Sequence, residues 1–263
     1  MWVPNGGSAE FSGGIFHSDG AGWAATWGPP LQKRKGNNLK WRSELSFVKV
    51  SLGTGQIMLK NFDDFLESSW ERNQVVGAWG FNSNLNFASI SPEETNVWFF
   101  EQVFNFLRSF FGLVVPDALE VITYNATKHI QKSNLDQQTF LDELMLIMKN
   151  LREPLWTLRV NLNIVGFLRT SFNTENPVRL QIQEPCTFII WGGPDETGFQ
   201  NYSISYHLFS TVVLEGENQE LWSINQPVLE KALQKWEQQS GHAIDVVDST
   251  GDAPVFRHGF QKK

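Results

Sequence analysis

A single cysteine, Cys186, is present among the 263 residues. One cysteine excludes an intrachain disulfide, and it excludes a zinc site built on several cysteines of one chain. Cys186 lies in an apolar run that ends at Trp191, which favours a buried, inert thiol over a nucleophile. Because disulfides persist mainly in oxidising compartments, we expect a cytoplasmic protein.

The sequence also lacks the short motifs of common catalytic and nucleotide-binding sites. It contains no G-x-S-x-G elbow, no phosphate-binding loop and no closely spaced histidine pair for a metal ion. No signal peptide is evident at the N-terminus. Val97–Val115 is long enough for a membrane span, but Glu101 and Arg108 inside it argue against a transmembrane segment. A net charge of −7 argues against nucleic-acid binding.

Aromatic residues are abundant, although tyrosine is scarce. The chain has 11 Trp and 21 Phe but only 3 Tyr. Large aromatic side chains suit protein cores, and they also suit cavities that hold apolar or sugar-like ligands. With 41% hydrophobic and 19% charged residues, the composition is that of a globular protein.

The stretch from Ser91 to Pro116 predicts one capped amphipathic helix. Ser91 and Glu94 have the spacing of a capping box, Pro92 suits the first helical position, and Pro116 cannot continue the helix. Polar residues cover about a third of the helix surface. The apolar remainder consists of Phe99, Phe100, Val103, Phe104, Phe106, Leu107, Phe110, Phe111, Val114 and Val115. We expect this face to be core, with a membrane-inserting or ligand-wrapping helix as the alternative.

The order of predicted elements is β-rich over 1–90, helical over 91–153, and β-rich with one helix over 154–263. The helical part includes predicted helices over 116–131 and about 134–150, from apolar residues at helical spacing. Further along, alternation predicts strands that include Trp156–Ile164, Tyr202–Phe209 and Leu221–Ile224, and a final helix follows over Pro227–Gln239. The fold class is therefore α+β: a curved antiparallel β-sheet system packed on a central helical block, residues 91–152, in a single domain over 1–263.

Candidate catalytic and ligand-binding residues come from two groups. His207 and Tyr206 alternate in a predicted strand, and His258 near Arg257 is a third residue that can serve as an acid or base near neutral pH. Several tryptophans at strand ends can line a ligand cavity, and Trp98 interrupts the polar side of the Phe-rich helix. The four are Trp27, Trp79, Trp98 and Trp191. The alternative for the histidines is a structural or surface role, and for the tryptophans packing at sheet edges.

Three carboxylates, Asp245, Asp248 and Asp252, surround a predicted turn. Such oxygen ligands can hold Ca²⁺ or Mg²⁺, although their spacing is not that of an EF-hand. The alternative is a solvated turn in which Asp side chains accept bonds from the backbone. The sequence predicts no other cofactor.

Three functional hypotheses remain open. The first is an aromatic-lined cavity that binds an apolar or aromatic small molecule, with cofactor-independent isomerisation or cyclisation as a further step. The second is a membrane-active or self-assembling, toxin-like protein that uses the Phe-rich helix or amphipathic strands. The third is a protein–protein interaction module.

Overall fold

The computed structural model describes residues 75–261, apart from 171–172, 195–196, 214–215, 218 and 250–253. The described residues belong to one compact unit, Gly36–Lys263. The elements predicted between residues 1 and 74, together with Trp27, lie outside the described residues. The single domain over 1–263 therefore stays a prediction.

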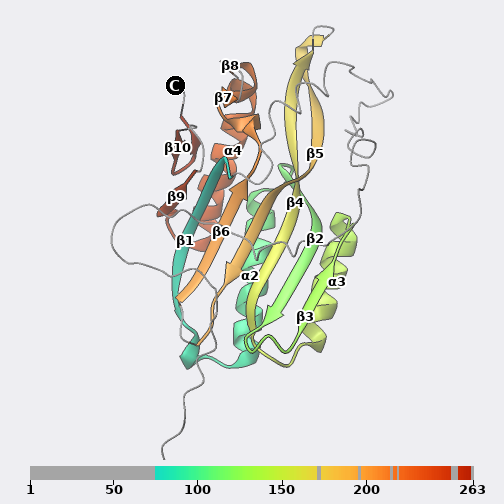
Figure 1. The fold of residues 1–263 in the computed structure, drawn as a ribbon, viewed down its shortest axis with the longest axis vertical. Helices are drawn as coiled ribbons and strands as arrows, with labels where there is room; N and C mark the ends of the chain where they lie inside the picture. The colour runs from blue at the N-terminus through green and yellow to red at the C-terminus, as the bar shows by residue number, and fades with distance from the viewer. Residues whose placement is uncertain are drawn as a thin grey trace, which may run out of the picture. The chain divides into compact units, whose positions relative to one another are not determined.

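Seven strands form one antiparallel sheet in the order β3-β2-β4-β5-β6-β1-β9 (Figure 1). In chain order they are β1 (Gly77–Asn86), β2 (Val114–Thr123), β3 (His129–Lys132), β4 (Leu155–Thr170), β5 (Asn173–Trp191), β6 (Thr197–Ile204) and β9 (Val246–Asp248). Two short hairpins accompany the sheet, formed by β7 (Val212–Val213) with β8 (Gly216–Glu217) and β10 (Val255–Phe256) with β11 (Gly259–Phe260).

Within the described part of the chain, three helices pack on the sheet, namely α2 (Pro92–Ser109), α3 (Gln137–Asn150) and α4 (Gln219–Ser240). In Figure 1 all three lie behind the strands, and α2 and α4 both contact β4 whereas α3 contacts β2. The predicted α+β class, an antiparallel sheet system packed on helices with one late helix, is confirmed. No helix within the described ranges is long and apolar enough to cross a membrane.

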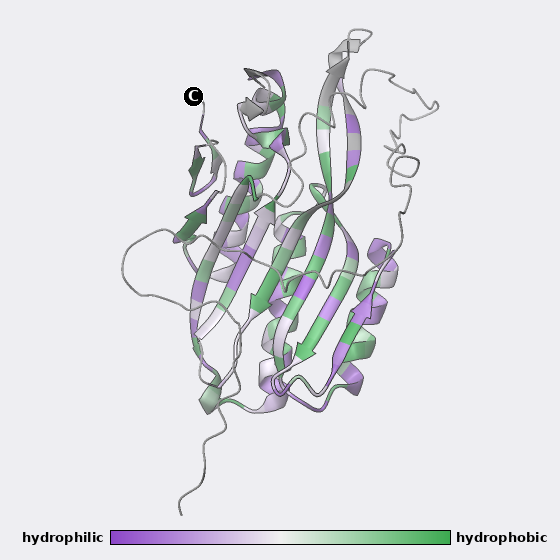
Figure 2. Cartoon of the chain, in the orientation of Figure 1, coloured by the Kyte–Doolittle hydropathy of each residue, from purple (hydrophilic) through white to green (hydrophobic). Residues whose placement is uncertain are grey.

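The strand register places one apolar face of the sheet against the helices. Trp79, Tyr202, Phe188 and Val160 lie opposite one another on β1, β6, β5 and β4, and each is at most 1% exposed. The residues that follow these four on their strands point to the other face of the sheet, because successive side chains of a strand alternate between its two faces. Figure 2 shows the resulting alternation of apolar and polar residues along the central strands.

Phe106 of α2 joins this sheet face to α4. Its ring stacks on Phe188 at 3.9 Å between centroids, and it lies 4.4 Å from Phe110 and 5.6 Å from Trp236 of α4. All four rings are fully buried. Cys186 lies beside this cluster and accepts a hydrogen bond from the Tyr202 hydroxyl at 3.5 Å. Burial raises the pKa of the Cys186 thiol to about 12, so the side chain stays a neutral thiol.

The predictions for the two ends of the Phe-rich helix differ in their success. Its start is confirmed, because the Ser91 side chain accepts a bond from the Glu94 N–H while the Glu94 carboxylate accepts one from the Ser91 N–H. Its predicted extension to Pro116 is wrong: α2 ends at Ser109 and the chain turns at Gly112, which has φ +83°. Glycine tolerates this left-handed conformation, and β2 follows directly.

The predicted helix over 116–131 is also wrong, since β2 and β3 occupy this segment. The apolar residues that matched a helical period match a strand as well: Leu119 and Val121 are both 1% exposed and point to the helices. The β-branched residues of β2 favour the extended chain. Pro116 lies next to an irregularity in the pairing with β4, where a missing N–H is tolerated.

The last predicted helix is confirmed over Pro227–Gln239 but begins earlier, at Gln219. The predicted strand Leu221–Ile224 is therefore wrong. A proline favours the first turn of a helix, yet Pro227 lies inside α4 and is exposed. Tyr202–Phe209 is a strand only as far as Ile204, and a 3₁₀ turn, η2 (His207–Phe209), follows.

Candidate functional site

A groove of about 480 Å³ opens at the C-terminal end of α2. Its walls come from the last turns of α2, the turn to β2, the start of β2 and the first turns of α3, and one residue of β5 completes it. The side chains that matter below are Phe104, Leu107, Arg108, Phe111, Leu141 and Arg179. We call this feature the α2–α3 groove.

The turn after α2 shapes one rim of this groove. The C-cap residue Phe110 points inward and is fully buried, whereas Phe111, the next residue, is 77% exposed. The Gly112 turn and the hydrogen bond from the Val114 N–H to the Phe110 carbonyl fix the backbone at this point. Phe111 is thereby held in an outward position at the groove, with Phe104, 41% exposed, farther back on α2.

Two arginines supply positive charge to a groove that is otherwise mostly apolar. Arg108 lies on the last turn of α2, and Arg179 comes from β5, which is remote in the sequence. Both are exposed, and neither guanidinium makes an ion pair within the described ranges. The Lys235 ammonium adds a third cation nearby, because it donates to the Arg108 carbonyl at 2.8 Å. The guanidinium fork matches the geometry of carboxylate, sulfonate and phosphate groups.

The predicted tryptophans do not share one cavity. Trp79 is fully buried, and its indole N–H donates to the Phe256 carbonyl at 2.7 Å. Trp98 packs edge-on against Phe87 and Phe99 at 5.1 Å. The register places Trp191 in the row of Asn82, three residues from Trp79 along β1, and hence on the opposite face of the sheet. Trp27 lies outside the described residues.

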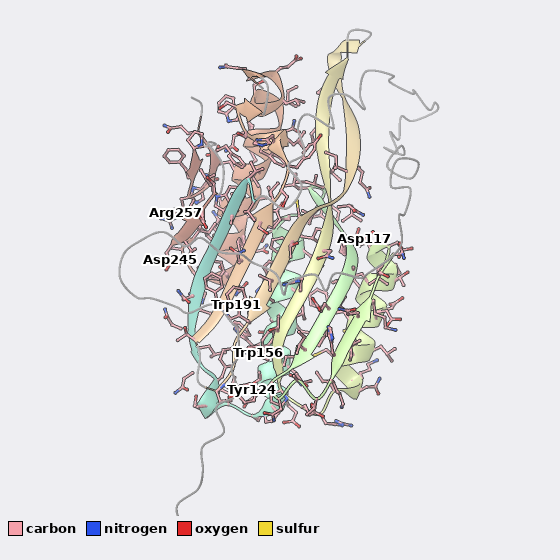
Figure 3. All side chains as sticks on the ribbon, viewed as in Figure 1. Asp117, Tyr124, Trp156, Trp191, Asp245 and Arg257 are labelled. Atoms are coloured by element: carbon pink, nitrogen blue, oxygen red, sulfur yellow. The ribbon has the colours of Figure 1, made fainter. Side chains whose placement is uncertain are left out.

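Trp191 belongs to an aromatic end of the sheet that the sequence did not reveal. Its ring lies 4.5 Å from Phe199, and Figure 3 places it near Trp156 and Tyr124. Gly193 lies against the side chains of both Tyr124 and Trp156, since a Cβ added at this position would contact both of them. Trp156, 37% exposed, lies beside an irregularity in the β2–β4 pairing, which turns its side chain away from the core.

The predicted acid–base residues are found in two separate settings. Tyr206 and His207 precede and begin η2 and are only 1% and 3% exposed. His258 lies between β10 and β11, and its Nε2 is 2.7 Å from Oε2 of Glu237 on α4. Their roles as catalytic residues stay predictions.

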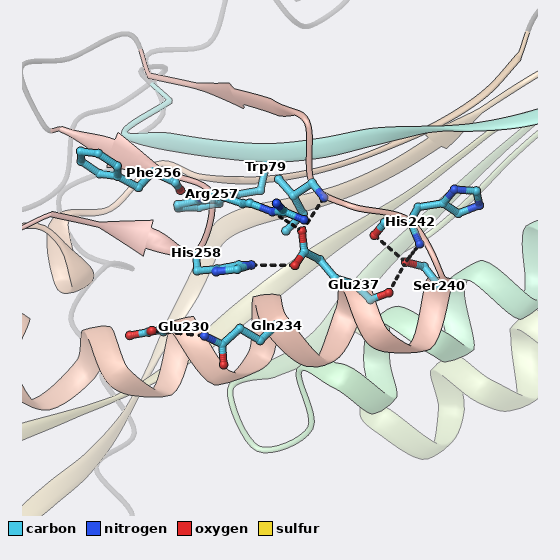
Figure 4. A network of polar contacts seen from close by, with 10 residues as sticks. Trp79, Glu230, Gln234, Glu237, Ser240, His242, Phe256, Arg257 and His258 are labelled. Carbon is cyan, nitrogen blue, oxygen red and sulfur yellow. Dashed lines mark hydrogen bonds and ion pairs between the residues drawn. The ribbon is translucent and has the colours of Figure 1, made fainter.

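Glu237 is the centre of the polar network in Figure 4. Its Oε1 accepts bonds from Arg257 Nε at 2.6 Å and from the Ile244 N–H at 2.6 Å, while Oε2 faces His258. Partial burial raises the pKa of the Glu237 carboxyl, but the hydrogen bonds from His258, Arg257 and Ile244 outweigh it, so that the net pKa lies below its usual value. The carboxylate thus joins α4 to the hairpin that carries His258.

Further bonds hold this hairpin, residues 255–260, which we call the C-terminal hairpin. The Gln226 amide donates to the His258 carbonyl and accepts from the Phe260 N–H, and the Trp222 indole donates to the Phe260 carbonyl. Gly259, with φ +120°, lets the Gln226 amide approach, because a Cβ there would collide with it. These contacts fix the backbone at His258 and so hold its side chain beside Glu237.

Two of the three predicted metal ligands lie at β9: Asp245 directly precedes the strand and Asp248 is its last residue. The Asp245 N–H donates to the Gly80 carbonyl, and Asp248 lies within β9 opposite Ala78. Figure 3 labels Asp245 at this edge of the sheet, near Arg257. Asp252 lies outside the described residues, and the described part of the chain holds no group of three or more His, Cys, Asp or Glu side chains placed to bind a metal ion.

The residues that the sequence did not single out are Arg179, Phe111 in its exposed position, and Glu237. Arg179 and Arg108 line the same groove only because the fold brings β5 and α2 there, so no local pattern could reveal the pair. A comparison of the chain with models of protein families, with curated proteins and with solved structures finds no match in any of the three.

Proposed function

We propose that the α2–α3 groove binds an apolar or aromatic small molecule that carries an anionic group. The observation that carries the proposal is a groove of about 480 Å³ with apolar walls and two guanidinium groups, those of Arg108 and Arg179. Binding sites for small molecules typically have volumes of roughly 300–1,000 Å³ and combine apolar walls with a few polar groups.

The walls and the arginines would contribute differently. Contact with Phe104, Leu107, Phe111 and Leu141 removes apolar surface of the ligand from water, which supplies most of the affinity. A carboxylate or sulfonate near Arg108 and Arg179 would fix the orientation, because charge-assisted hydrogen bonds are directional. The chemical class is therefore an aromatic or aliphatic acid.

The proposal is for binding. The residues that line the groove, all within the described ranges, include no carboxylate, imidazole, thiol or amine. Isomerisation or cyclisation at this place would need a group that moves a proton, and neither His207 nor His258 is among the lining residues.

Fluorescence titration with 1-anilinonaphthalene-8-sulfonate tests the proposal, since this probe is an aromatic anion. We expect a saturable increase in its fluorescence with one site per chain. The uncharged analogue N-phenyl-1-naphthylamine separates the two contributions, because it has the aromatic rings without the sulfonate.

Variants at the groove complete the test. Arg108→Gln combined with Arg179→Gln is expected to weaken the sulfonate probe about tenfold and to leave the uncharged probe unchanged. Phe111→Ser is expected to weaken both. Arg152→Gln is the matched control, because Arg152 is an exposed arginine that does not line the groove. Equal effects of the control and the double variant, or fluorescence that never saturates, contradict the proposal.

A further inference from the structure

The outward side of α2 carries apolar and charged residues at regular spacing. Val97, Glu101, Phe104, Arg108 and Phe111 are spaced alternately four and three residues apart and are all exposed. This spacing keeps Val97, Glu101, Phe104 and Arg108 on one narrow face of the helix, and Phe111 follows in the turn after it. We call these five residues the α2 stripe. Val97, Phe104 and Phe111 are 47%, 41% and 77% exposed.

This face differs from the ordinary solvent side of the neighbouring helix. The outward residues of α4 include Glu230, Lys231 and Lys235, which is typical of a solvated helix surface. By contrast, α2 exposes Val97 and Phe104 there and Phe111 follows in the turn after it, while α3 exposes Met145 and Leu146, which are 44% and 52% exposed. Exposed apolar side chains that gather on one face of a molecule mark interaction sites.

The two charges of the α2 stripe are arranged symmetrically about Phe104. Glu101 precedes Phe104 by nearly as many residues as Arg108 follows it, and Val97 and Phe111 flank it equally. Glu101 and Arg108 are about 10 Å apart along the helix axis, too far to pair with each other. Within the described ranges neither forms an ion pair.

This arrangement is complementary to itself. When two copies of α2 lie antiparallel about a two-fold axis beside Phe104, Glu101 of each copy faces Arg108 of the other. The same axis brings Phe104 against Phe104 and Val97 next to Phe111. A two-fold interface requires that one surface patch match its own rotated copy, and the α2 stripe meets this condition in both charge and apolarity.

We infer that the chain forms a two-fold symmetric dimer through antiparallel packing of the α2 stripes. The partner is a second copy of this chain. Because one helix and its flank supply the contact, the interface is small, and the dissociation constant is expected on the order of micromolar. Phe104, Arg108 and Phe111 also line the α2–α3 groove, so the second copy covers part of its rim. The dimer does not rest on the small-molecule proposal.

Sedimentation velocity of the full chain over a concentration series tests the inference. We expect a reversible monomer–dimer equilibrium for the unchanged protein. Glu101→Arg and Arg108→Glu each place like charges opposite one another twice per dimer, so each is expected to weaken the dimer about tenfold or more. The combined variant E101R/R108E restores opposite charges and is expected to recover the dimer.

Recovery by the double reversal is the decisive result, since misfolding of a single variant cannot produce it. Phe104→Glu is expected to abolish the dimer, and Phe256→Glu is its matched control, because Phe256 is 47% exposed on the C-terminal hairpin. Arg179→Gln affects the groove alone and distinguishes failure of ligand binding from failure of association. The inference is overturned if the unchanged protein stays monomeric at every concentration. It is also overturned if the combined variant E101R/R108E dimerises as weakly as the two single variants. Flotation of the unchanged protein with phosphatidylcholine vesicles in place of self-association also overturns it.

Discussion

Replacing Phe106 by alanine is expected to lower the free energy of unfolding by about 3–5 kcal/mol. Removal of a fully buried phenylalanine ring costs this much, because apolar burial is lost and a cavity remains. The value is expected near the upper end of the range. The ring stacks on Phe188 at 3.9 Å and packs against Phe110 at 4.4 Å, and aromatic pairs add about 0.5–1.5 kcal/mol each beyond the area that they bury.

Phe104→Ala is the matched control on the same helix. Both phenylalanines belong to the predicted apolar side of the helix, but the structure buries Phe106 completely and leaves Phe104 41% exposed. Alanine has a higher helix propensity than phenylalanine by about 0.5 kcal/mol, and this gain applies to both variants. We therefore expect Phe104→Ala to change stability by no more than about 1 kcal/mol.

Urea denaturation followed by far-ultraviolet circular dichroism measures the difference. It is done at low protein concentration, so that association through the α2 stripe does not contribute. A lower midpoint with an unchanged m-value indicates a change in stability alone. If the two variants cost the same, the packing of Phe106 between the sheet and α4 is not what stabilises this helix, and the argument fails.

Three further predictions concern other parts of the molecule. Because folding lowers the pKa of Glu237, its stabilising effect is complete above the unfolded-state pKa of about 4.3 and is lost as the pH falls through the folded-state pKa. The stability difference between the unchanged protein and Glu237→Gln should thus shrink from pH 7 to pH 3, and a constant difference in denaturation midpoints contradicts this. Cys186, with a pKa raised to about 12, is expected to react with an aromatic disulfide reagent at pH 8 only after unfolding in urea, so rapid labelling of the native protein counts against its burial. Asn225→Ala is expected to lower the free energy of unfolding by about 2–3 kcal/mol, as measured by thermal or urea denaturation. The reason is that the Asn225 amide accepts a hydrogen bond from the Phe167 N–H and donates one to the Phe167 carbonyl. An unchanged stability would show that these bonds are dispensable.

Local signals in the sequence were reliable where one mechanism dominates. The capping box at Ser91 and the alternation over Trp156–Ile164 give the start of α2 and part of β4, and each depends on residues that are close in the chain. The helix prediction for residues 116–131 was wrong because the spacing of their apolar residues fits both a helical and a strand period. Pairing with β4 stabilises the strand. Such pairing is a tertiary effect, which local propensity does not contain.

The candidate site was harder to predict than the fold. The pattern of α2 could not show which phenylalanines would be covered, since that depends on where β2 and α3 lie. The aromatic abundance of the chain predicted a ligand cavity lined by tryptophan, yet Trp79 fills the core and Trp191 lies on the other face of the sheet. The arginines of the α2–α3 groove, Arg108 and Arg179, come from elements that meet only in three dimensions.

The contacts of the C-terminal hairpin bear on the order in which the molecule forms during synthesis. The Trp79 indole N–H can form its hydrogen bond only after the Phe256 carbonyl, 177 residues later in the chain, has been synthesised. β1 likewise pairs with β6 and β9, both of which are made long after it, so the sheet closes only when late segments arrive. Contacts between segments so distant in sequence slow folding. A nascent chain that ends before Phe256 therefore lacks both the carbonyl that accepts the Trp79 indole N–H and the Phe260 ring that packs edge-on against Trp79 at 5.4 Å.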